Sequence, residues 1–329
     1  MKKGVYEMKK YDIIALGETL IDFTPAGSSP AGMLLFERNP GGAPVNMLVC
    51  AANMGCRTGF IGKIGADMQG RFLEETIRSA GVDTGGLVIT DDFFTTLAFV
   101  TIDEQGERSF SFARKPGADT QLDVNELNMD MVQNTGIFHI GSLSMTDEPA
   151  RNAALTAVET AKKAGATISY DPNYRPLLWK DASEAQKQIR SLLPYVDVIK
   201  ISDEECAITT GCADYRKAAQ ILRNQGISCV VVTLGDKGAY ISAGQGECEA
   251  DSFPVSAVVD TTGAGDAFWG AFLACVSKSG KRVGELSLED LHAYGSFACA
   301  AASLCVQKRG GIPAMPDRES VEALCGYTI

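Results

Sequence analysis

Short apolar runs alternate with amphipathic segments along most of this chain. The apolar runs are bounded by turn residues and predict strands at residues 12–16, 60–61, 136–140, 167–170, 196–201 and 229–234. Between them, apolar residues recur at helical spacing and predict helices at residues 45–54, 70–80, 150–164, 185–193 and 215–224. Strands that alternate with helices in this way indicate an α/β fold, with a central, mainly parallel sheet and helices on both of its faces.

Two segments do not follow this alternation. Thr95–Ile102 and Arg108–Phe112 have the pattern of strands and are joined by Asp103–Gly106, a typical hairpin turn, whereas Ser28–Arg38 looks extended and loop-like. Because hairpin strands cannot belong to a strand–helix–strand unit, we expect a small β lid over one edge of the sheet, close to a ligand. The lid would consist of two segments of a single domain that spans all 329 residues, about 20–38 and 93–114.

The composition of the chain excludes several kinds of binding partner and site. The formal net charge of −11 argues against nucleic acid or an anionic membrane, and an anionic substrate would have to be captured by local donors. No run reaches the roughly 18 apolar residues of a membrane span, and no secretory signal is visible. None of the ten cysteines forms a C-x-x-C pair, so we expect reduced thiols in the cytoplasm. With His139 and His292 as the only histidines, a histidine-based triad or metal site is not expected.

The segment Asp260–Phe268 carries the clearest chemical signal, because Gly263, Ala264 and Gly265 directly precede Asp266. Small residues at a helix start leave backbone N–H groups free, and these groups bind phosphate oxygens at the positive end of the helix dipole. A carboxylate repels phosphate, so a loop that only held phosphate would avoid one here. A general base that deprotonates a hydroxyl while the amides stabilise a transferring phosphoryl group needs this arrangement. The simpler alternative is an ordinary capped helix after a glycine turn.

A second group of small and polar residues lies nearer the N-terminus. Gly41 and Gly42 permit close approach of the backbone to a ligand, and Pro44 favours a first helical turn. Asn46, one turn later, offers a donor and an acceptor to a polyol, and Asp22 follows the first predicted strand, where a carboxylate suits sugar hydroxyls. The alternatives are a plain turn before a helix, with a solvated Asn46, and an exposed loop acid.

Two arginines are candidate cations for phosphoryl oxygens or for an acidic sugar group. Arg175 closes the segment Asp171–Arg175, which follows a predicted strand, and Arg114 lies at the end of the expected lid. For Arg114 a solvated surface position is an equal alternative.

Two further strand ends carry residues suited to a nucleotide. Thr233, Gly235 and Gly238 would let backbone amides approach a phosphate or a ribose, although a plain hairpin turn explains the same residues. Ser202 and Glu205 open a predicted helix, where they either order water bound to Mg²⁺ or form a capping box.

Taken together, these residues resemble the ribokinase-like (PfkB) family of carbohydrate kinases, over nearly the whole chain from Gly17 to Pro316. Two motifs carry the resemblance, the glycine-rich segment Gly41–Gly70 and Asp260–Asp266, of which the second is highly specific. Within the family the chain looks most like fructokinases, on the segments Leu20–Phe23, Phe138–Ser142, Asp171–Trp179 and Lys200–Glu205. Ser202 stands where many members of the family have Asn, a departure that fructokinases often share.

The resemblance implies a set of site residues. It makes Asp266 the catalytic base beside an anion hole formed by Gly263, Ala264 and Gly265. It assigns the sugar to Asp22, Gly41, Gly42 and Asn46, and ATP with Mg²⁺ to Asn173, Ser202, Glu205, Thr233, Gly235 and Gly238. It also suggests a monovalent cation, K⁺, held by Asp260, Thr262 and the carbonyl groups of Cys305, Lys308, Gly310 and Ala314.

The activity that this pattern favours is ATP-dependent phosphorylation of a primary sugar hydroxyl, with fructose converted to fructose 6-phosphate. A 2-keto-3-deoxygluconate kinase is an alternative, because such kinases share much of the segment Asp171–Trp179. A non-catalytic sugar- or nucleotide-binding regulator on the same fold is a further alternative, which the intact Asp266, Gly263 and Gly265 disfavour. The strand edges of a β lid need covering and therefore predict a homodimer.

Overall fold

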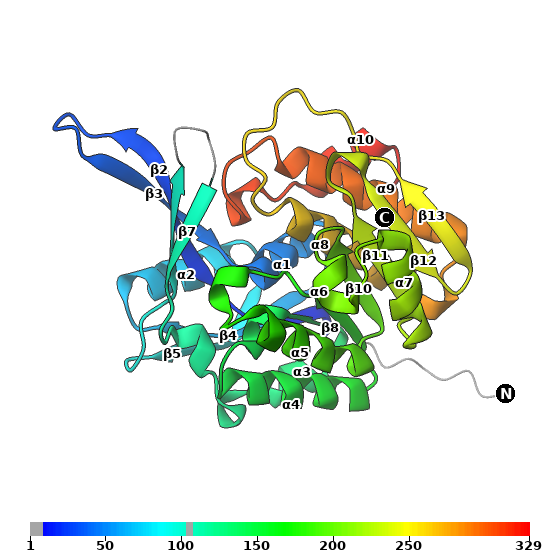
Figure 1. Cartoon of the computed structure of the whole chain (residues 1–329), viewed down its shortest axis with the longest axis horizontal. Coiled ribbons are helices and arrows are strands. Elements are labelled where there is room, and N and C mark those ends of the chain that lie inside the picture. Colours follow the sequence, from blue (N-terminus) through cyan, green and yellow to red (C-terminus); the bar gives the residue numbers. More distant parts are fainter. Residues whose placement is uncertain (1–8, 103–107) are drawn as a thin grey trace.

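The computed structural model of the protein describes residues 9–102 and 108–329. Its centre is a sheet in the strand order β13-β12-β11-β10-β9-β8-β1-β4-β5 (Figure 1). The bounds are β1 Tyr11–Leu16, β4 Thr58–Gly65, β5 Asp83–Thr90, β8 Thr135–Gly141, β9 Thr167–Asp171, β10 Val198–Ser202, β11 Cys229–Thr233, β12 Ala239–Ala243 and β13 Gly246–Ala250. All pairings from β11 to β5 are parallel, and β12 and β13 add an antiparallel edge. The predicted mainly parallel sheet is confirmed.

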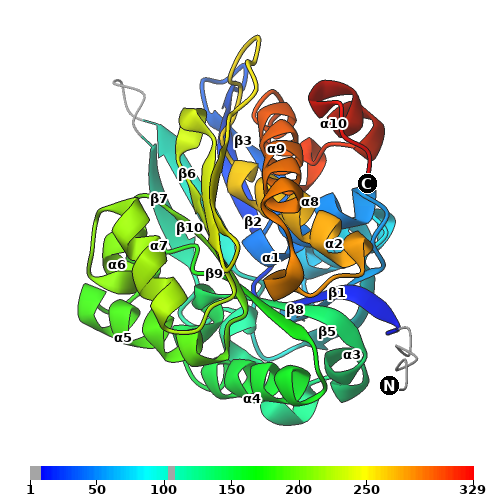
Figure 2. The ribbon, with the colours of Figure 1, turned by 90° about the vertical axis from the view of Figure 1, so that its right-hand side faces the viewer.

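Helices cover both faces of the sheet (Figure 2). One layer contains α1 Ala43–Asn53, α2 Met68–Ser79, α8 Ala264–Ser279, α9 Leu288–Cys305 and α10 Arg318–Cys325. The other contains α3 Met129–Gln133, α4 Ala150–Lys163, α5 Ala182–Leu192, α6 Cys206–Thr210 and α7 Tyr215–Asn224. Successive strand residues point to opposite faces, so in β1 the side chains of Ile13 and Ala15 join the first layer and those of Ile14 and Leu16 the second.

The predicted elements are found, and three strands of the central sheet, β5, β12 and β13, were not predicted. Predicted helix ends differ from the observed ones by three residues or fewer, and the strand around residues 60–61 is longer than expected. In β5 the pair Gly85-Gly86 interrupts the apolar run, and β13 carries Glu247 and Glu249 on the edge of the sheet. Both patterns are weak strand signals because edge strands need not be apolar.

A smaller sheet projects from the body in the order β3-β2-β6-β7 (Figure 1). Its strands are β2 Leu20–Ser28, β3 Leu34–Gly41, β6 Leu97–Ile102 and β7 Arg108–Ala113. These strands confirm a β lid, but the loop-like prediction for Ser28–Arg38 is wrong from Leu34 onwards, where β3 pairs with β2. The apolar residues Leu34–Phe36 are all exposed in this thin sheet, so the strand has no alternating pattern. The predicted turn at 103–106 lies outside the described residues.

The order of the strands decides where a ligand can bind. From β1 the chain passes to β4 and β5 on one side, and it later builds β8 to β11 on the other side. Ligands of parallel sheets bind at the carboxyl ends of the strands where this direction reverses, here between β1 and β8. The segments after β1, β9 and β10 and the N-terminus of α8 meet in this region.

A chain of buried polar contacts fixes α8 against the sheet. Trp269, one turn after Asp266, donates from Nε1 to the Ser169 hydroxyl at 3.0 Å, and that hydroxyl lies 2.9 Å from His139 Nδ1. All three side chains are buried, and burial lowers the pKa of His139 to about 4. His139 is therefore neutral at physiological pH and acts as a structural group of the core.

Candidate functional site

The N-terminus of α8 presents backbone donors without partners. Gly263 adopts φ 81°, a left-handed conformation that glycine tolerates best, and it turns the chain into the helix. Ala264 donates a long hydrogen bond to the Thr261 carbonyl at 3.3 Å. Within the described residues, the N–H groups of Gly263, Gly265 and Asp266 donate none. These amides are therefore available to an anion, as predicted, whereas that of Ala264 is partly engaged.

Asp266 lies on the first turn of α8 and points to α1. Its Oδ2 accepts a hydrogen bond from Asn46 Nδ2 at 2.8 Å. Burial raises the pKa of Asp266 to about 6, while the charge of Lys200 and the Asn46 bond act in the opposite direction. The residue as a whole is half-buried at the start of the helix. A carboxylate with a raised pKa beside free amides has the properties of a general base.

Asn46 is placed by the start of α1. Gly42 precedes this helix at φ 120°, and a Cβ there would lie 2.5 Å from the Glu18 carbonyl, so a larger residue would displace this turn. The Glu18 carboxylate accepts from the Ala43 amide at 3.2 Å, and burial raises its pKa to about 7. Asn46 is buried, and its Oδ1 has no hydrogen-bond partner in the described part of the chain. The predicted turn and helix start are confirmed, and they bring Asn46 to Asp266.

Asp22 approaches the same region from the lid. It lies in β2 opposite Asn39, and a Cβ on Gly41 would be 2.9 Å from its Oδ2. Burial raises the pKa of Asp22 to about 6; the positive charge of Arg175 opposes this effect, and the charge of Asp266 adds to it. Arg175 is exposed and donates to the Tyr174 carbonyl at 3.1 Å. Asp22, Arg175 and Asp266 are thus close enough to interact electrostatically.

Asp260 joins the α8 start to the loop after α9. Its Oδ1 accepts from the Thr262 amide at 3.0 Å and its Oδ2 from the Gly310 amide at 3.1 Å. Cys305 Sγ lies 3.7 Å from the Thr262 carbonyl. The other two residues predicted to hold a monovalent cation lie in the same loop, Lys308 and Ala314. Tertiary contacts therefore bring four of the predicted cation residues together beside Gly263: Asp260, Thr262, Cys305 and Gly310.

A buried ion pair at the ends of β9 and β10 was not predicted as part of the site. Lys200 Nζ lies 2.5 Å from Asp171 Oδ2, and both side chains are buried. Glu205 lies nearby and accepts from the amides of Tyr174 at 2.6 Å and Ser202 at 2.9 Å. Burial raises the pKa of Glu205, and the charge of Asp171 adds to this shift. In the sequence, a lysine and an aspartate at the ends of adjacent apolar strands were the available signal.

The predicted capping geometry accompanies this pair. The Ser202 hydroxyl accepts from the Glu205 amide at 3.3 Å, so the reciprocal contacts of a capping box are present. They close a turn after β10, and α6 begins only at Cys206. Asn173 adopts φ 44°, which Asn tolerates better than most residues, and its amide donates to Asp171 Oδ1 at 3.1 Å. Both residues hold their segments in place at the ends of β9 and β10.

The predicted nucleotide loop lies beside Ser202. Thr233 ends β11 and pairs with Ser202 across the sheet. The turn that follows contains Gly235 and Gly238, and the Leu234 amide donates to the Gly238 carbonyl at 2.8 Å. This is the hairpin between β11 and β12, and at Gly238 a Cβ would lie 2.0 Å from the Ala250 carbonyl. The hairpin interpretation is confirmed. Glycine is needed at position 238 because a side chain there would collide with the Ala250 carbonyl.

Arg114 is not exposed to a ligand. It is buried, and each of its three guanidinium nitrogens donates within the protein, to Asp119, Thr146 and the Leu143 carbonyl at 2.8–3.0 Å. The structure therefore does not support the prediction that Arg114 binds phosphoryl oxygens or an acidic sugar. It also contradicts the alternative that Arg114 is a solvated surface residue. Its buried partner Asp119 was not recognised in the sequence.

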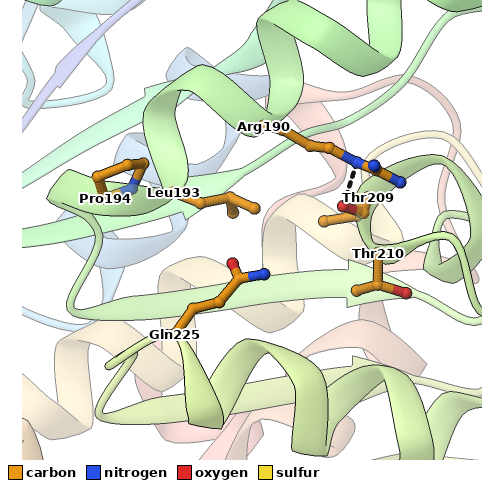
Figure 3. A pocket seen from close by; sticks show the side chains of 6 residues that line it. All are labelled: Arg190, Leu193, Pro194, Thr209, Thr210 and Gln225. Carbon is orange, nitrogen blue, oxygen red and sulfur yellow. Dashed lines mark hydrogen bonds between the residues drawn. The ribbon is translucent and has the colours of Figure 1, made fainter.

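A separate cavity of about 380 Å³ lies among α5, α6 and α7 (Figure 3). It is lined by Arg190, Leu193, Pro194, Thr209, Thr210 and Gln225. Arg190 Nε donates to the Thr209 carbonyl at 2.9 Å and so satisfies a carbonyl at the C-terminal end of α6. None of the predicted site residues lies in this cavity.

Three further properties of the described residues concern metal ions, membranes and thiols. No group of three or more His, Cys, Asp or Glu side chains among them is arranged to hold a metal ion. No helix in residues 9–102 and 108–329 has the length and apolarity to cross a membrane. All ten cysteines fall within this part of the chain, and all are free thiols.

Substitution of Asp266 by Asn is expected to stabilise the protein at neutral pH. Because burial raises the folded pKa to about 6 from 3.8, the folded state disfavours the ionised carboxylate. The resulting cost is absent below the ordinary pKa and complete above pH 6. We expect Asp266→Asn to raise the free energy of unfolding in urea by on the order of 2 kcal/mol at pH 7.5, and by much less near pH 4.

Asp147→Asn, a change at an exposed aspartate, is the control and should leave both values almost unchanged. A variant Asp266→Asn that is less stable than wild type at pH 7.5 would contradict the argument.

Known proteins of similar sequence and structure identify the family. The profile of the pfkB family carbohydrate kinases matches residues 10–318. The chain is 40% identical to fructokinase-1 of Zea mays over 315 residues, which cover 94% of this chain and 96% of that protein. The fructokinase of Xylella fastidiosa with bound ATP superposes with a TM-score of 0.86 at 34% identity, covering 96% of this chain and 98% of that chain.

A fructokinase of Vibrio cholerae O395, in its fructose, ADP and calcium ion bound form, gives the same TM-score of 0.86 at 29% identity. That match covers 96% of this chain and 99% of the other. These matches cover nearly the whole chain and therefore include the motifs at the carboxyl edge of the sheet. This chain belongs to the pfkB family of carbohydrate kinases.

Proposed function

We propose that the protein transfers the γ-phosphoryl group of ATP to the primary hydroxyl of fructose and releases fructose 6-phosphate and ADP. The observation that carries the proposal is the carboxylate of Asp266, whose pKa burial raises to about 6, beside the free amides of Gly263 and Gly265. The named relatives support the choice of substrates, because they are fructokinases and two were solved with ATP or with fructose and ADP.

In this reaction Asp266 takes the proton of the attacking hydroxyl. The sugar oxygen forms a bond to the γ-phosphorus as the bond to the β-phosphate oxygen breaks, and ADP leaves with that electron pair. The amides at the start of α8 stabilise the negative charge of the transferring group. Asn46 holds the Asp266 carboxylate through its Nδ2 group and thereby fixes the direction of the base.

The sugar would lie between the lid and the start of α1. Burial and nearby charges, and no hydrogen bond within the described residues, act on the Asp22 carboxylate, so its oxygens are available to sugar hydroxyls. Gly41 and Gly42 keep the wall beside it free of side chains, and Asn46 Oδ1 adds an unused acceptor. Movement of the lid over the sugar would exclude water, which otherwise competes as the acceptor of the phosphoryl group.

The nucleotide would lie across the ends of β10 and β11, with Mg²⁺ on its phosphates. Asn173, Ser202, Glu205, Thr233, Gly235 and Gly238 lie along this path. The carboxylates of Asp171, Glu205 and Asp266 outnumber the single ammonium of Lys200, so this region favours an additional cation. Mg²⁺ usually keeps several waters and phosphate oxygens as ligands, which fits the lack of a protein metal cage among the described residues. When bound, it would neutralise charge on the phosphates.

We further propose a monovalent cation, K⁺, near the anion hole. The Asp260 carboxylate accepts hydrogen bonds from the amides of Thr262 and Gly310. These bonds bring two segments with available carbonyl groups together beside Gly263. Oxygen groups of this kind suit a hard cation. The free thiols support a reducing compartment, and we propose a cytoplasmic location on that ground.

The second candidate is a kinase for the acidic sugar 2-keto-3-deoxygluconate. Arg175 is exposed near Asp22 and is the residue that would pair with a sugar carboxylate. Arg114 no longer supports this alternative, because its guanidinium is occupied inside the protein.

An ADP-release assay with ATP and Mg²⁺ over fructose, 2-keto-3-deoxygluconate, ribose, glucose and adenosine tests the substrate. We expect kcat/KM for fructose to exceed every other value at least about tenfold, a difference of 1.4 kcal/mol in transition-state binding. Preference for the acidic sugar would keep the mechanism and replace the substrate. If none of these sugars is phosphorylated while nucleotide binding is retained, a non-catalytic regulator is favoured.

Asp266→Asn should lower kcat at least ~10²-fold, because a general base contributes about that much or more. For the wild type, kcat/KM should be level above pH 6 and fall as the pH drops below it, since Asp266 and Asp22 are protonated there. The matched control Asp147→Asn should keep wild-type rates. Near-normal turnover of Asp266→Asn would exclude Asp266 as the base.

We also propose a homodimer formed through the lid. Met33, Leu34, Leu35 and Phe36 are 38–68% exposed on or beside β3, an edge strand of the lid sheet. Phe36 packs edge-on against Phe99, which stacks on Phe23 at 5.1 Å, so the apolar face is continuous. A second copy of the same lid would cover both this face and the strand edge.

Sedimentation should therefore give twice the monomer mass of 35.0 kDa for the wild type. Leu35→Lys should shift the protein to the monomer mass, whereas Leu324→Lys, at a partly exposed position on α10, should not. A wild-type protein that sediments as a monomer at micromolar concentration would overturn the proposal.

A further inference from the structure

We propose that Glu18 is a positioning residue of this site: its buried carboxyl group clamps the base of the lid to the start of α1 and so sets the direction of Asn46 toward Asp266. The inference rests on the proposed kinase function and adds to it a residue that acts through another. Glu18 lies in the short connection from β1 to β2, where the lid begins, and β3 returns from the lid to α1 at Gly41.

The first turn of α1 cannot be capped by its own N-cap residue. Gly42 holds that position at φ 120°, and a Cβ there would lie 2.5 Å from the backbone oxygen of Glu18 and 2.8 Å from Thr19 Cα. The polar side chains that usually cap a helix are therefore excluded. The acceptor comes from Glu18 instead, whose Oε1 accepts from the Ala43 amide at 3.2 Å.

The residues on either side of Glu18 hold the same turn. A Cβ on Gly17 would lie 2.5 Å from Pro44 Cγ, so the backbone there packs directly on the first turn of α1. Thr19 is buried and donates from Oγ1 to the Gly41 carbonyl at 3.0 Å. This connection therefore fixes both the end of β3 and the start of α1.

The burial of Glu18 is costly and indicates a specific role. The residue is 4% exposed, and its Oε2 has no hydrogen-bond partner among the described residues. Burial raises its pKa, and the positive charge of Arg114 opposes that shift. A carboxyl group retains acceptor capacity whether or not it is ionised, so the bond to Ala43 does not depend on the protonation state.

The Arg114–Asp119 pair anchors the other end of the lid at the same place. Arg114 follows β7, and its guanidinium donates to Asp119, Thr146 and the Leu143 carbonyl. The charges of Arg114 and Asp119 both act on Glu18, so the three side chains lie close together. The connections of β2, β3 and β7 to the body of the protein thus meet around Glu18.

Asn46 transmits the effect of this clamp to the base. Its backbone amide donates to the Gly42 carbonyl at 2.9 Å, so its direction depends on the first turn of α1. Its Nδ2 lies 2.8 Å from Asp266 Oδ2, and this is the side-chain hydrogen bond that acts on the Asp266 carboxylate within the described residues. The alternative role of Glu18 is that of an ordinary cap, which stabilises α1 without affecting the reaction.

Two substitutions of Glu18 distinguish these roles. Glu18→Met removes the acceptor at a similar side-chain length, whereas Glu18→Gln keeps an acceptor. In Glu18→Met, kcat with fructose should fall at least about tenfold, toward the ~10²-fold cost of a displacement of about 1 Å, and Glu18→Gln should retain most of the wild-type rate. KM for ATP should change less than about twofold, because the proposed nucleotide residues lie along the ends of β9 to β11.

Asp214→Leu is the matched control. Asp214 caps α7, in the other helix layer, by accepting from the Lys217 amide at 2.9 Å. This variant should lower the melting temperature, as Glu18→Met does, and leave kcat unchanged. If Glu18→Met also lowers only the melting temperature, Glu18 is an ordinary cap and the inference fails.

A double-mutant cycle tests the route through Asn46. In an Asn46→Ala background the Asp266 carboxylate has already lost its hydrogen bond, so adding Glu18→Met should lower kcat by less than about threefold. Equal losses in the two backgrounds would contradict the route.

Hydrogen exchange separates this inference from the proposed function, because it needs no turnover. Backbone amides at the start of α1 should exchange faster in Glu18→Met than in the wild type or in Glu18→Gln. If they do while no sugar is phosphorylated, the proposed function fails and the clamp remains. If exchange is unchanged while fructose is phosphorylated, the clamp fails and the proposed function remains.

Discussion

The unbonded N-terminus of α8, with a carboxylate on its first turn, is the constraint on which the rest of this structure depends. The amides of Gly263 and Gly265 attract an anion, whereas Asp266 repels one. The two can serve one reaction only if each is held in a fixed direction. Asn46 donates a hydrogen bond that holds the Asp266 carboxylate. Trp269 donates to Ser169 and so attaches α8 to the central sheet.

The balance of charge follows from this arrangement. Asp22, Asp171, Glu205, Asp260 and Asp266 all lie near the carboxyl edge of the sheet, in a protein whose formal net charge is −11. Such a field opposes an anionic nucleotide. Capture therefore depends on short-range donors, such as the unbonded amides at the start of α8. The same field raises the pKa of a carboxylate and so favours a base that works near neutral pH.

The sequence predicted the layers of the fold well because buried parallel strands and amphipathic helices have strong periodic signals. It also predicted Asp266 and its amides, since helix-start chemistry is local and leaves a recognisable run of small residues. The sequence-based prediction failed for charged residues that are buried, because a charged residue is usually expected to face solvent or a ligand. Arg114 was predicted as a ligand cation, but Asp119, Thr146 and Leu143 occupy it inside the protein. β3 looked like a loop because a thin lid sheet does not need one apolar and one polar face.

By itself, the sequence determined the alternation of strands and helices in the central sheet, the glycines that turn the chain into α1 and α8, and the carboxylate at the start of α8. These features depend on neighbours within one or two turns, so the local sequence is sufficient. Only the tertiary structure decided that Asn46 meets Asp266 from 220 positions away, and that Asp260 clips Thr262 to Gly310. It alone also decided that Lys200 reaches Asp171 beside Gly265. Contacts of this kind follow from the strand order of the parallel sheet, which brings distant segments to one edge and leaves no periodic trace in the sequence.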